Sequence, residues 1–265
     1  MATASDTHGT SATPLTVIIT GASRGLGQAL ALRFLDVRAH VVTITRTAVP
    51  ALIQRASDTG SRLSSIEADL STASGVERAG SALKATLNAI AARSSRVILI
   101  NNAGAVEPVD VAQALTDPET ITRAFGLNVS APIALTAAVL SSLPEHGRDC
   151  RVLNISSGAG RQPTAGWSVY CATKAALDMA TRVLNVEQSS RGVRAVALAP
   201  GVVDTGMQNT LRSQSTDNFP AQARFAALHA EGKLSSADDV AARIHDYLNR
   251  DDFGATEIDD IRNYN

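Results

Sequence analysis

A glycine-rich turn between an apolar stretch and a helical pattern constrains this sequence most. Residues Leu15 to Thr20 are apolar and rich in β-branched side chains, which predicts a buried strand. The strand runs directly into residues 21–27, Gly-Ala-Ser-Arg-Gly-Leu-Gly, and apolar residues then recur at helical spacing. Glycines let the backbone approach a pyrophosphate, and a helix N-terminus offers unpaired N–H groups and a positive dipole end. This order of elements favours a phosphate cradle over a plain glycine turn.

The alternation of strand and helix continues along the chain. Helical patterns separate most of the further predicted strands, which lie at 40–45, 63–67, 96–100, 152–156, 194–199 and 254–259. With no repeat and no clear linker, this pattern predicts one Rossmann-type α/β domain over residues 15–265, a doubly wound parallel sheet in a three-layer α/β/α arrangement. Residues 1–14 are rich in Ser, Thr, Ala and Gly and are expected to form a flexible arm. The segment 202–233 shows little regular pattern and is interpreted as a long loop, of the kind that often forms a lid.

Ligands of such a sheet bind at the carboxyl ends of its strands. Six short segments follow predicted strands and should therefore meet at one edge: 21–27, Arg46, Asp69, 101–104, Ser157 and 200–201. In dinucleotide-binding folds an acidic residue usually follows the second strand and binds the ribose hydroxyls. Here that strand ends at Arg46, and the glycine turn carries Arg24. Two arginines suit a 2′-phosphate, so we expect NADP(H) rather than NAD(H), with Asp69 placed to contact the adenine.

Tyr170 and Lys174 are four positions apart, a spacing that stacks two side chains on one face of a helix. An ammonium group near the phenol favours the phenolate and is expected to lower the tyrosine pKa from about 10. Such a tyrosine can exchange a proton with a substrate. Ser157 ends a predicted strand, and its hydroxyl is placed to bind the same substrate oxygen. By itself the Tyr–Lys spacing also suits a packed tyrosine and a solvated lysine.

The composition excludes several other classes of function. The formal net charge is −1 and no long basic run is present, which argues against nucleic acid as a partner. The two cysteines and five scattered histidines do not have the spacing of a disulfide framework or a metal site. No apolar stretch approaches the length of a membrane span, and the start does not follow the plan of a signal peptide. We therefore expect a soluble, cytoplasmic protein with no membrane contact.

Taken together, these motifs resemble the short-chain dehydrogenase/reductase family. The resemblance runs from about Leu15 to the C-terminus and includes Asn128 within a helical stretch. It implies a catalytic set of Asn128, Ser157, Tyr170 and Lys174, in which Tyr170 is the proton donor. Lys174 would also bind the nicotinamide ribose, and Asn128 would support a water-mediated proton path through Lys174. The implied cofactor contacts are Gly21, Ser23, Arg24, Gly25, Leu26, Gly27, Arg46, Asp69, Leu70, Asn102, Ala103, Gly104, Tyr170, Lys174, Pro200, Gly201, Val203, Thr205 and Met207.

Several longer stretches resemble the sepiapterin reductase group within that family, whose microbial relatives include benzil reductases. They lie at 21–25, 154–157, 162–174 and 199–207. The likeness implies an NADPH-dependent carbonyl reductase acting on a ketone or a vicinal dicarbonyl such as sepiapterin or benzil. Its implied substrate contacts are Ser157, Gly158, Thr164, Trp167, Tyr170, Gly201, Met207 and Asp259. Gly158, Ala159 and Thr164 stand where bulkier residues line the sepiapterin pocket, which predicts a roomier site.

Three questions stay open at the level of the sequence. Asp259 is either the carboxylate that anchors the amino-pyrimidine edge of a pterin, as the resemblance implies, or a solvated carboxylate in an acidic tail. A one-residue offset leaves Asp260 as the alternative anchor. The function could also be that of a 3-oxoacyl or steroid-type reductase, or of a non-catalytic NADP-binding regulator, which would be expected to lack Tyr170 or Lys174. The family implies a homodimer or homotetramer.

Overall fold

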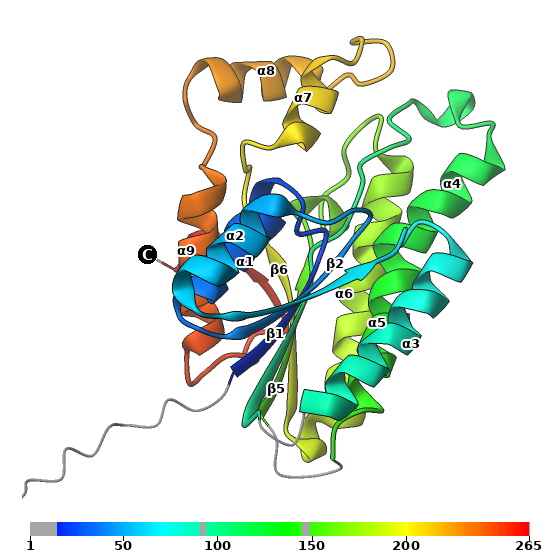
Figure 1. Ribbon diagram of the computed structural model, residues 1–265. Helices are drawn as coiled ribbons and strands as arrows, with labels where there is room; N and C mark the ends of the chain where they lie inside the picture. Colours follow the sequence, from blue (N-terminus) through cyan, green and yellow to red (C-terminus); the bar gives the residue numbers. More distant parts are fainter. Residues whose placement is uncertain (1–14, 91–93, 145–148, 265) are drawn as a thin grey trace, which may run out of the picture.

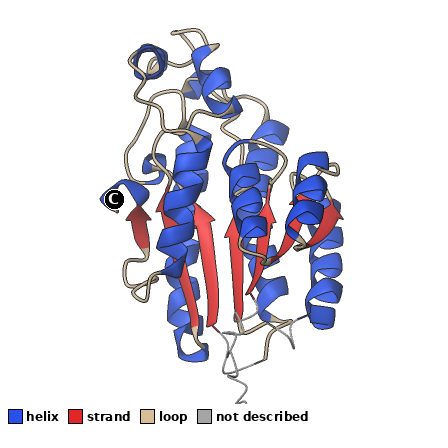
Figure 2. Ribbon diagram, turned by 60° about the vertical axis from the view of Figure 1, so that its left-hand side comes forward, coloured by secondary structure: helices blue, strands red, loops and turns tan. Residues whose placement is uncertain are grey.

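Seven parallel strands form one sheet at the centre of the computed structural model, which describes residues 15–90, 94–144 and 149–264. Their order across the sheet is β3-β2-β1-β4-β5-β6-β7. The strands are β1 (Leu15–Thr20), β2 (His40–Thr45), β3 (Arg62–Glu67), β4 (Arg96–Asn101), β5 (Asp149–Ile155), β6 (Val193–Ala199) and β7 (Ile258–Asp260). All run in the same direction, so their carboxyl ends meet at one edge (Figure 2). The predicted doubly wound parallel sheet is confirmed, and the expected arm 1–14 lies outside the described residues.

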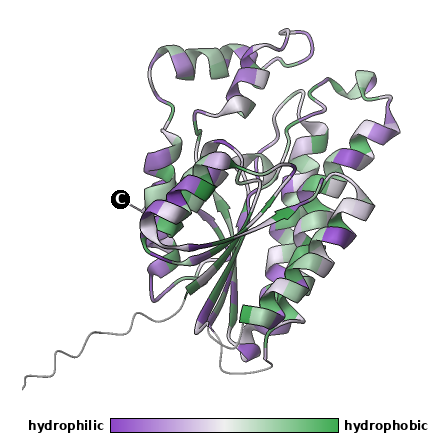
Figure 3. Ribbon diagram, in the orientation of Figure 1, coloured by the Kyte–Doolittle hydropathy of each residue, from purple (hydrophilic) through white to green (hydrophobic). Residues whose placement is uncertain are grey.

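Helices cover both faces of the sheet (Figure 1). One face carries α1 (Gly25–Asp36), α2 (Pro50–Thr59) and α9 (Ala237–Asn249), and the other carries α3 (Ala73–Ile90), α4 (Pro118–Phe125), α5 (Ala131–Leu140) and α6 (Ser168–Gln188). Each face has its own apolar core, one built around α1 and the other around α3 and α5. The central strands consist mostly of hydrophobic residues (Figure 3), and these belong to both apolar cores, because a parallel sheet between two helical layers is buried on both faces.

Two parts of the helical layer differ from the sequence-based expectation. Helix α2 is not predicted, although Pro50 at its first position is a typical start signal. The segment 202–233 is not an irregular loop, because it contains α7 (Gly206–Arg212) and α8 (Gln222–Ala230) above the carboxyl edge (Figure 2). These helices are only seven and nine residues long, so their periodicity is weak. Tertiary packing of their few apolar residues holds them in place.

The expectation that no apolar stretch approaches the length of a membrane span is wrong: by length and composition the helical segment Pro118–Leu140 could cross a membrane, with a mean hydropathy of 1.4 over its best window. It contains α4, a π-helical turn at Gly126–Ser130 and α5. Leu135 and Val139 of α5 are fully buried in the core beneath the sheet. The packing is that of a core helix in a globular domain.

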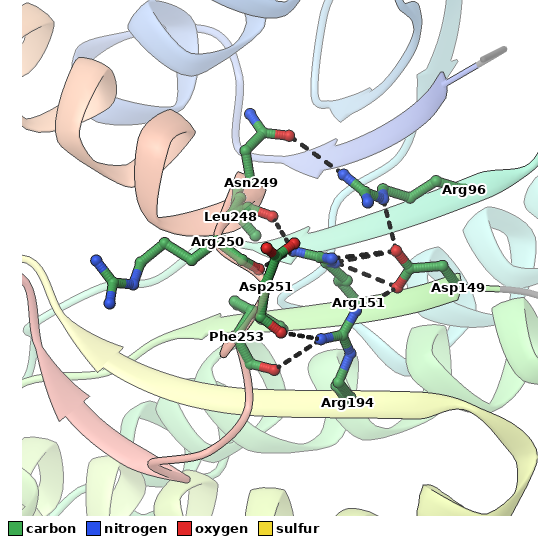
Figure 4. Close-up of polar contacts among 9 residues, drawn as sticks. All are labelled: Arg96, Asp149, Arg151, Arg194, Leu248, Asn249, Arg250, Asp251 and Phe253. Carbon is green, nitrogen blue, oxygen red and sulfur yellow. Dashed lines mark hydrogen bonds and ion pairs between the residues drawn. The ribbon is translucent and has the colours of Figure 1, made fainter.

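An ionic cluster joins the amino ends of three neighbouring strands (Figure 4). It consists of Arg96 from β4, Asp149 and Arg151 from β5, and Arg194 from β6, and all three arginines donate hydrogen bonds to the Asp149 carboxylate. Arg151 also donates to the carbonyls of Leu248, in the last turn of α9, and of Arg250, which follows that helix. We call these four residues the amino-end cluster. It fixes the chain between α9 and β7 to the sheet on the side away from the strand carboxyl ends.

Candidate active site

Close backbone packing leaves no room for side chains at two glycines of the turn after β1. Gly21 has φ +69°, and a Cβ there would lie 2.9 Å from the Cα of Ala103, so the turn admits no side chain at that point. A Cβ on Gly27 would collide with the Gly21 carbonyl and the Asn102 amide. The Asn102 side chain donates to the carbonyls of Thr20 and Gly21 and thereby fixes the turn. This narrow backbone cradle at the N-terminus of α1 fits a pyrophosphate.

The loop after β6 returns to the same turn. A Cβ on Gly25 would lie 3.1 Å from the Thr205 methyl group, and a Cβ on Gly206 would lie 3.6 Å from the Arg24 guanidinium. Predicted cofactor residues that are about 180 positions apart are thus neighbours in space.

Arg46 and Asp69 lie beside the glycine turn at the ends of β2 and β3. The Ser71 backbone N–H and hydroxyl, with a smaller contribution from Arg46, hold the pKa of Asp69 below its usual value. Asp69 therefore stays ionised, and its carboxylate accepts both hydrogen bonds from Ser71 in the turn after β3. The Arg24 and Arg46 side chains are exposed, which leaves both guanidinium groups accessible to a phosphate.

Three predicted cofactor residues, Leu26, Leu70 and Val203, have buried side chains. The side chains of Leu26 and Leu70 are about 95% buried and belong to the two apolar cores. Val203 forms an isolated bridge with Ser235, which ties the start of the 202–233 segment to its end.

Ser157, Tyr170 and Lys174 meet where the end of β5 touches α6. Lys174 Nζ donates to the Ile155 carbonyl at 2.8 Å and lies 5.6 Å from the centre of the Tyr170 ring. The Ser157 hydroxyl lies within hydrogen-bonding reach of the phenol oxygen. Its oxygen also accepts a hydrogen bond from the Ala159 backbone N–H at 3.1 Å. The structure therefore brings together three of the four residues predicted to be catalytic.

The predicted lowering of the Tyr170 pKa is wrong in this structure. Burial raises the pKa of Tyr170 to about 12, and the hydrogen bond from Ser157 only partly opposes this effect. The Lys174 ammonium lies over the ring and binds the Ile155 carbonyl, so it does not offset the desolvation of the phenolate. Tyr170 is therefore fully protonated near neutral pH and has a proton to give.

Lys174 is a buried cation with unused donors. Burial lowers its pKa to about 8, and the nearby Asp178 carboxylate acts in the opposite direction. An ammonium group has three N–H donors. Among the described residues one of them is used, in the bond to Ile155, which leaves the others for a ribose hydroxyl or a water molecule.

Asn128, the fourth residue predicted to be catalytic, lies in the π-helical turn between α4 and α5 and is 1% exposed. Its side chain accepts from the Ala105 N–H and donates to the Ala105 carbonyl and the Thr173 hydroxyl. These bonds fix the loop after β4 to α6, next to Lys174. The π turn interrupts the helical stretch at Asn128, while the water path through Lys174 stays a prediction.

An aromatic cluster covers Tyr170 on the side of α7 and α8. Trp167 packs edge-on against Tyr170 at 5.1 Å between ring centres and stacks on Phe219 at 5.2 Å. Phe225 contacts both Trp167 and Phe219. We call Trp167, Phe219 and Phe225 the aromatic cluster. Sequence reasoning found Trp167 but missed both phenylalanines, because they lie in the segment interpreted as irregular.

The other predicted substrate residues surround this cluster. Met207 packs against its edge, and the Thr164 carbonyl accepts a hydrogen bond from the Trp167 backbone. A Cβ on Gly158 would meet no atom within 4 Å, consistent with the expected roomier site.

The structure does not support Asp259 as a substrate anchor, nor as a solvated carboxylate. Its carboxylate accepts hydrogen bonds from the Tyr247 and Tyr264 hydroxyls at 2.9 and 2.5 Å. It also accepts from the Asp260 backbone N–H and the Asn263 amide. Asp259 is only 4% exposed, so these partners occupy both of its oxygens.

The strand register explains this placement. Asp259 lies beside Leu198, whose side chain belongs to the core on the α1 and α9 face. Asp260 is the next residue and faces the other way, toward α6. Hydrogen bonds from Arg262, with a minor contribution from Arg161, hold the pKa of Asp260 below its usual value. Of the two candidates, only Asp260 lies on the face of the sheet that carries Tyr170.

The described residues contain no group of three or more His, Cys, Asp or Glu side chains that could hold a metal ion.

Comparisons with known proteins agree with this geometry. The family model described as short chain dehydrogenase matches residues 15–216. A benzil reductase ((S)-benzoin forming) of Bacillus cereus is 37% identical over 245 residues, which cover 91% of this chain and 97% of that protein. A sepiapterin reductase of Meriones unguiculatus is 33% identical over 245 residues, with coverage of 89% and 92%. Among solved structures, a blue fluorescent protein from a metagenomic library in complex with NADPH aligns with a TM-score of 0.75 and 25% identity, over 93% of this chain and 95% of that one.

Proposed function

The chain belongs to the short-chain dehydrogenase family of oxidoreductases, and on that premise we propose that it is an NADPH-dependent carbonyl reductase of aromatic ketones and vicinal dicarbonyls such as benzil. The observation that carries the proposal is the contact of Ser157, Tyr170 and Lys174 beneath an aromatic cluster. The first three groups suit a carbonyl oxygen, and the cluster suits a flat apolar substrate.

NADPH, when bound in the cradle, supplies the hydride that reduces the carbonyl carbon. Ser157 holds the carbonyl oxygen by a hydrogen bond. Tyr170 gives its phenol proton to the oxygen as negative charge develops there, so ketone, hydride and proton together yield the alcohol. A tyrosine with a pKa of about 12 is protonated before the reaction and remains a much stronger acid than an ordinary alcohol. The hydrogen bond from Ser157, which favours the charged form of Tyr170, stabilises the phenolate that is left until solvent returns the proton.

Arg24 and Arg46 support the choice of NADPH over NADH. Arg24 lies in the glycine turn and Arg46 directly follows β2. Neither β2 nor its end offers a carboxylate for the ribose hydroxyls. The neighbouring blue fluorescent protein is itself a complex with NADPH.

Benzil is favoured over sepiapterin because the carboxylate expected to anchor a pterin is already saturated. Both oxygens of Asp259 bind protein donors. Benzil has no N–H groups and needs no such anchor. A 3-oxoacyl or steroid-type substrate is the second candidate, and the open space at Gly158 favours a bulky one.

The deciding experiment measures NADPH oxidation by the purified protein with benzil, an aromatic dione, sepiapterin and an acetoacetyl thioester. We expect benzil and the dione to give the highest kcat/KM. Preference for the thioester would assign the protein to the 3-oxoacyl reductases. NADPH binding without turnover of any substrate would instead indicate the non-catalytic regulator.

Asp259→Asn and Asp260→Asn refine this assignment. We expect Asp259→Asn to lower thermal stability and to change the KM of benzil and sepiapterin alike. A selective loss of sepiapterin reduction in Asp260→Asn would identify that residue as a pterin anchor.

We further propose that the protein assembles through the outer faces of α5 and α6. Large apolar side chains are exposed there, at Ile133, Met179, Val183 and Val186. Val186 is 82% exposed. Light scattering should give the mass of a dimer or tetramer, and Val186→Glu should shift it toward the monomer.

A further inference from the structure

Helix α6 presents a third ionisable residue on the same face as Tyr170 and Lys174. Asp178 follows Lys174 by four positions, as Lys174 follows Tyr170, so the three side chains form one stripe along the helix. Asp178 is 7% exposed although it is a carboxylate. Buried carboxylates need paired or hydrogen-bonded partners, so the groups that Asp178 binds show what it does.

The stripe holds three consecutive residues at the end of β5. Lys174 Nζ donates to the carbonyl of Ile155 at 2.8 Å, and the Ser156 hydroxyl donates to Asp178 Oδ1 at 2.5 Å. Ser157, the next residue, meets the phenol of Tyr170. Each of three successive turns of α6 therefore holds one residue, and the contact at Ser156 lies directly before the catalytic serine.

The other oxygen of Asp178 secures the turn that follows Ser157. Arg161 Nε donates to Asp178 Oδ2 at 3.2 Å, and Arg161 Nη1 donates to the Asp259 carbonyl of β7 at 3.3 Å. Gly160 lies against α6 so closely that a Cβ would be 3.0 Å from Asp178 Oδ2. The carboxylate thus fixes the backbone on both sides of Ser157.

We propose, resting on the reductase activity proposed above, that Asp178 is a positioning residue: through Ser156 and Arg161 it holds the Ser157 hydroxyl in register with Tyr170 and Lys174 for reduction of the carbonyl. A misplacement of about 1 Å at a reacting group costs on the order of 100-fold in rate. The hydrogen bond between Ser156 and Asp178 lies directly before Ser157, so its loss can produce such a shift.

Asp178 has a second effect on the same site through its charge. Burial lowers the pKa of Lys174 to about 8, and the Asp178 carboxylate opposes that shift. The other ionisable groups of this region are Tyr170 on α6 and Arg161 on the turn after β5. Asn128 and the Ile155 carbonyl supply neutral dipoles. Removal of the carboxylate should therefore move loss of the Lys174 proton to lower pH.

The test compares three variants of the same helix–strand contact. Asp178→Asn removes the charge and keeps the shape, while Ser156→Ala removes only the hydroxyl bond. Thr181→Val is the matched control, because the Thr181 hydroxyl accepts from Asn154 of β5 at 2.9 Å, one turn further from Ser157. For each variant, kcat, KM, NADPH affinity and the pH profile of kcat are measured with the best substrate of the panel.

We expect kcat to fall about 10- to 100-fold in Asp178→Asn and by a smaller factor in Ser156→Ala, with NADPH affinity unchanged. The alkaline limb of the pH profile should move to lower pH in Asp178→Asn alone, and Asp178→Glu should restore part of kcat. The variant that combines Asp178→Asn with Ser156→Ala should lose less kcat than the product of the two single losses, because both changes break the same contact. Losses of kcat equal to that of Thr181→Val, or an unshifted pH profile, would overturn the proposal.

A readout without substrate separates this inference from the proposed function. The chain has three lysines, and Lys84 and Lys233 serve as references for labelling with a trace amine reagent at a series of pH values. The pH at which Lys174 becomes reactive should fall in Asp178→Asn and stay constant in Thr181→Val.

If the wild-type protein reduces no carbonyl but this shift occurs, the function fails and the coupling of Asp178 to Lys174 stands. If carbonyls are reduced and neither kcat nor labelling responds, the coupling fails alone. If Asp178→Asn does not fold, the kcat of Ser156→Ala against Thr181→Val decides.

Discussion

The ionisable groups at the two ends of strand β5 differ in how many protein partners they have. At its amino end, Arg96, Arg151 and Arg194 bind Asp149, and each of the three guanidinium nitrogens of Arg151 donates a hydrogen bond (Figure 4). At its carboxyl end, Lys174 is buried with one protein partner among the described residues, and Tyr170 is kept protonated by burial. Paired charges stabilise the fold, whereas donors without protein partners are available to a ligand. The difference separates residues that hold this protein together from residues proposed to react.

Loss of the Tyr170 hydroxyl should have the largest effect. Tyr170→Phe keeps the ring in its contact with Trp167 and removes the proton, so we expect kcat to fall by about 10²–10⁴ or more. Fluorescence titration should show unchanged NADPH affinity. Tyr247→Phe is the control, since it removes a buried hydroxyl bound to Asp259 on the other face and should keep kcat. A Tyr170→Phe enzyme with most of its turnover would make Tyr170 a packing residue.

Arg151→Met should show the converse pattern, with a loss of stability and no loss of chemistry. Arg151 is 2% exposed, and its removal leaves the Leu248 and Arg250 carbonyls without its hydrogen bonds, while Arg96 and Arg194 still bind Asp149. A buried acceptor left without a partner costs about 1–3 kcal/mol of unfolding free energy. Urea denaturation measures this loss, and kcat well below the melting temperature should be unchanged. Arg55→Met, which breaks the exposed pair with Asp36, should change stability little. Equal effects of the two variants would show that the amino-end cluster is not stabilising.

Acid should weaken the amino-end cluster before it affects the residues proposed to be catalytic. Burial alone would raise the pKa of Asp149, but the hydrogen bonds and charges of Arg151, Arg194 and Arg96 hold it at about 2. A folded-state pKa below the unfolded value of 3.8 stabilises the protein above pH 3.8, and this stabilisation is lost as the pH falls through about 2. Because one pKa unit is worth about 1.4 kcal/mol, we expect about 2 kcal/mol to be lost over that range. The Asp149→Asn variant should lack this part of the acid dependence, and an identical dependence in both proteins would exclude Asp149 as its source.

The smallest effect concerns the exposed cations beside the glycine turn. A hydrogen bond to a charged group is worth roughly 1.5–3 kcal/mol, and about 1.4 kcal/mol is tenfold in affinity. Arg46→Asp should therefore reduce the preference for NADPH over NADH at least tenfold, as measured by the two dissociation constants. Arg24→Ala should act in the same direction. Equal affinity of the wild-type protein for both cofactors would remove the basis for the 2′-phosphate assignment.

Local pattern predicted much of the fold and the core of the site. The apolar runs, the glycine turn and the four-residue spacing of Tyr170 and Lys174 each lie within one or two elements, where sequence periodicity is informative. Helices α7 and α8 were missed because each is too short to show a repeated apolar pattern, and their apolar residues pack in the cluster around Trp167. Asp178 also escaped notice, although its spacing continues the Tyr170–Lys174 stripe and would have been the signal for it.

The amino-acid order by itself determined which groups could react and at which edge of the sheet they would meet. Tertiary structure alone decided the environment of each ionisable group. The sign of the Tyr170 pKa shift depends on burial, to which Phe219 contributes from 49 positions further along the chain. The role of Asp259 depends on hydroxyls from α9 and the C-terminal turn. Burial and hydrogen bonding are set by residues that are distant in sequence, so local periodicity does not encode them.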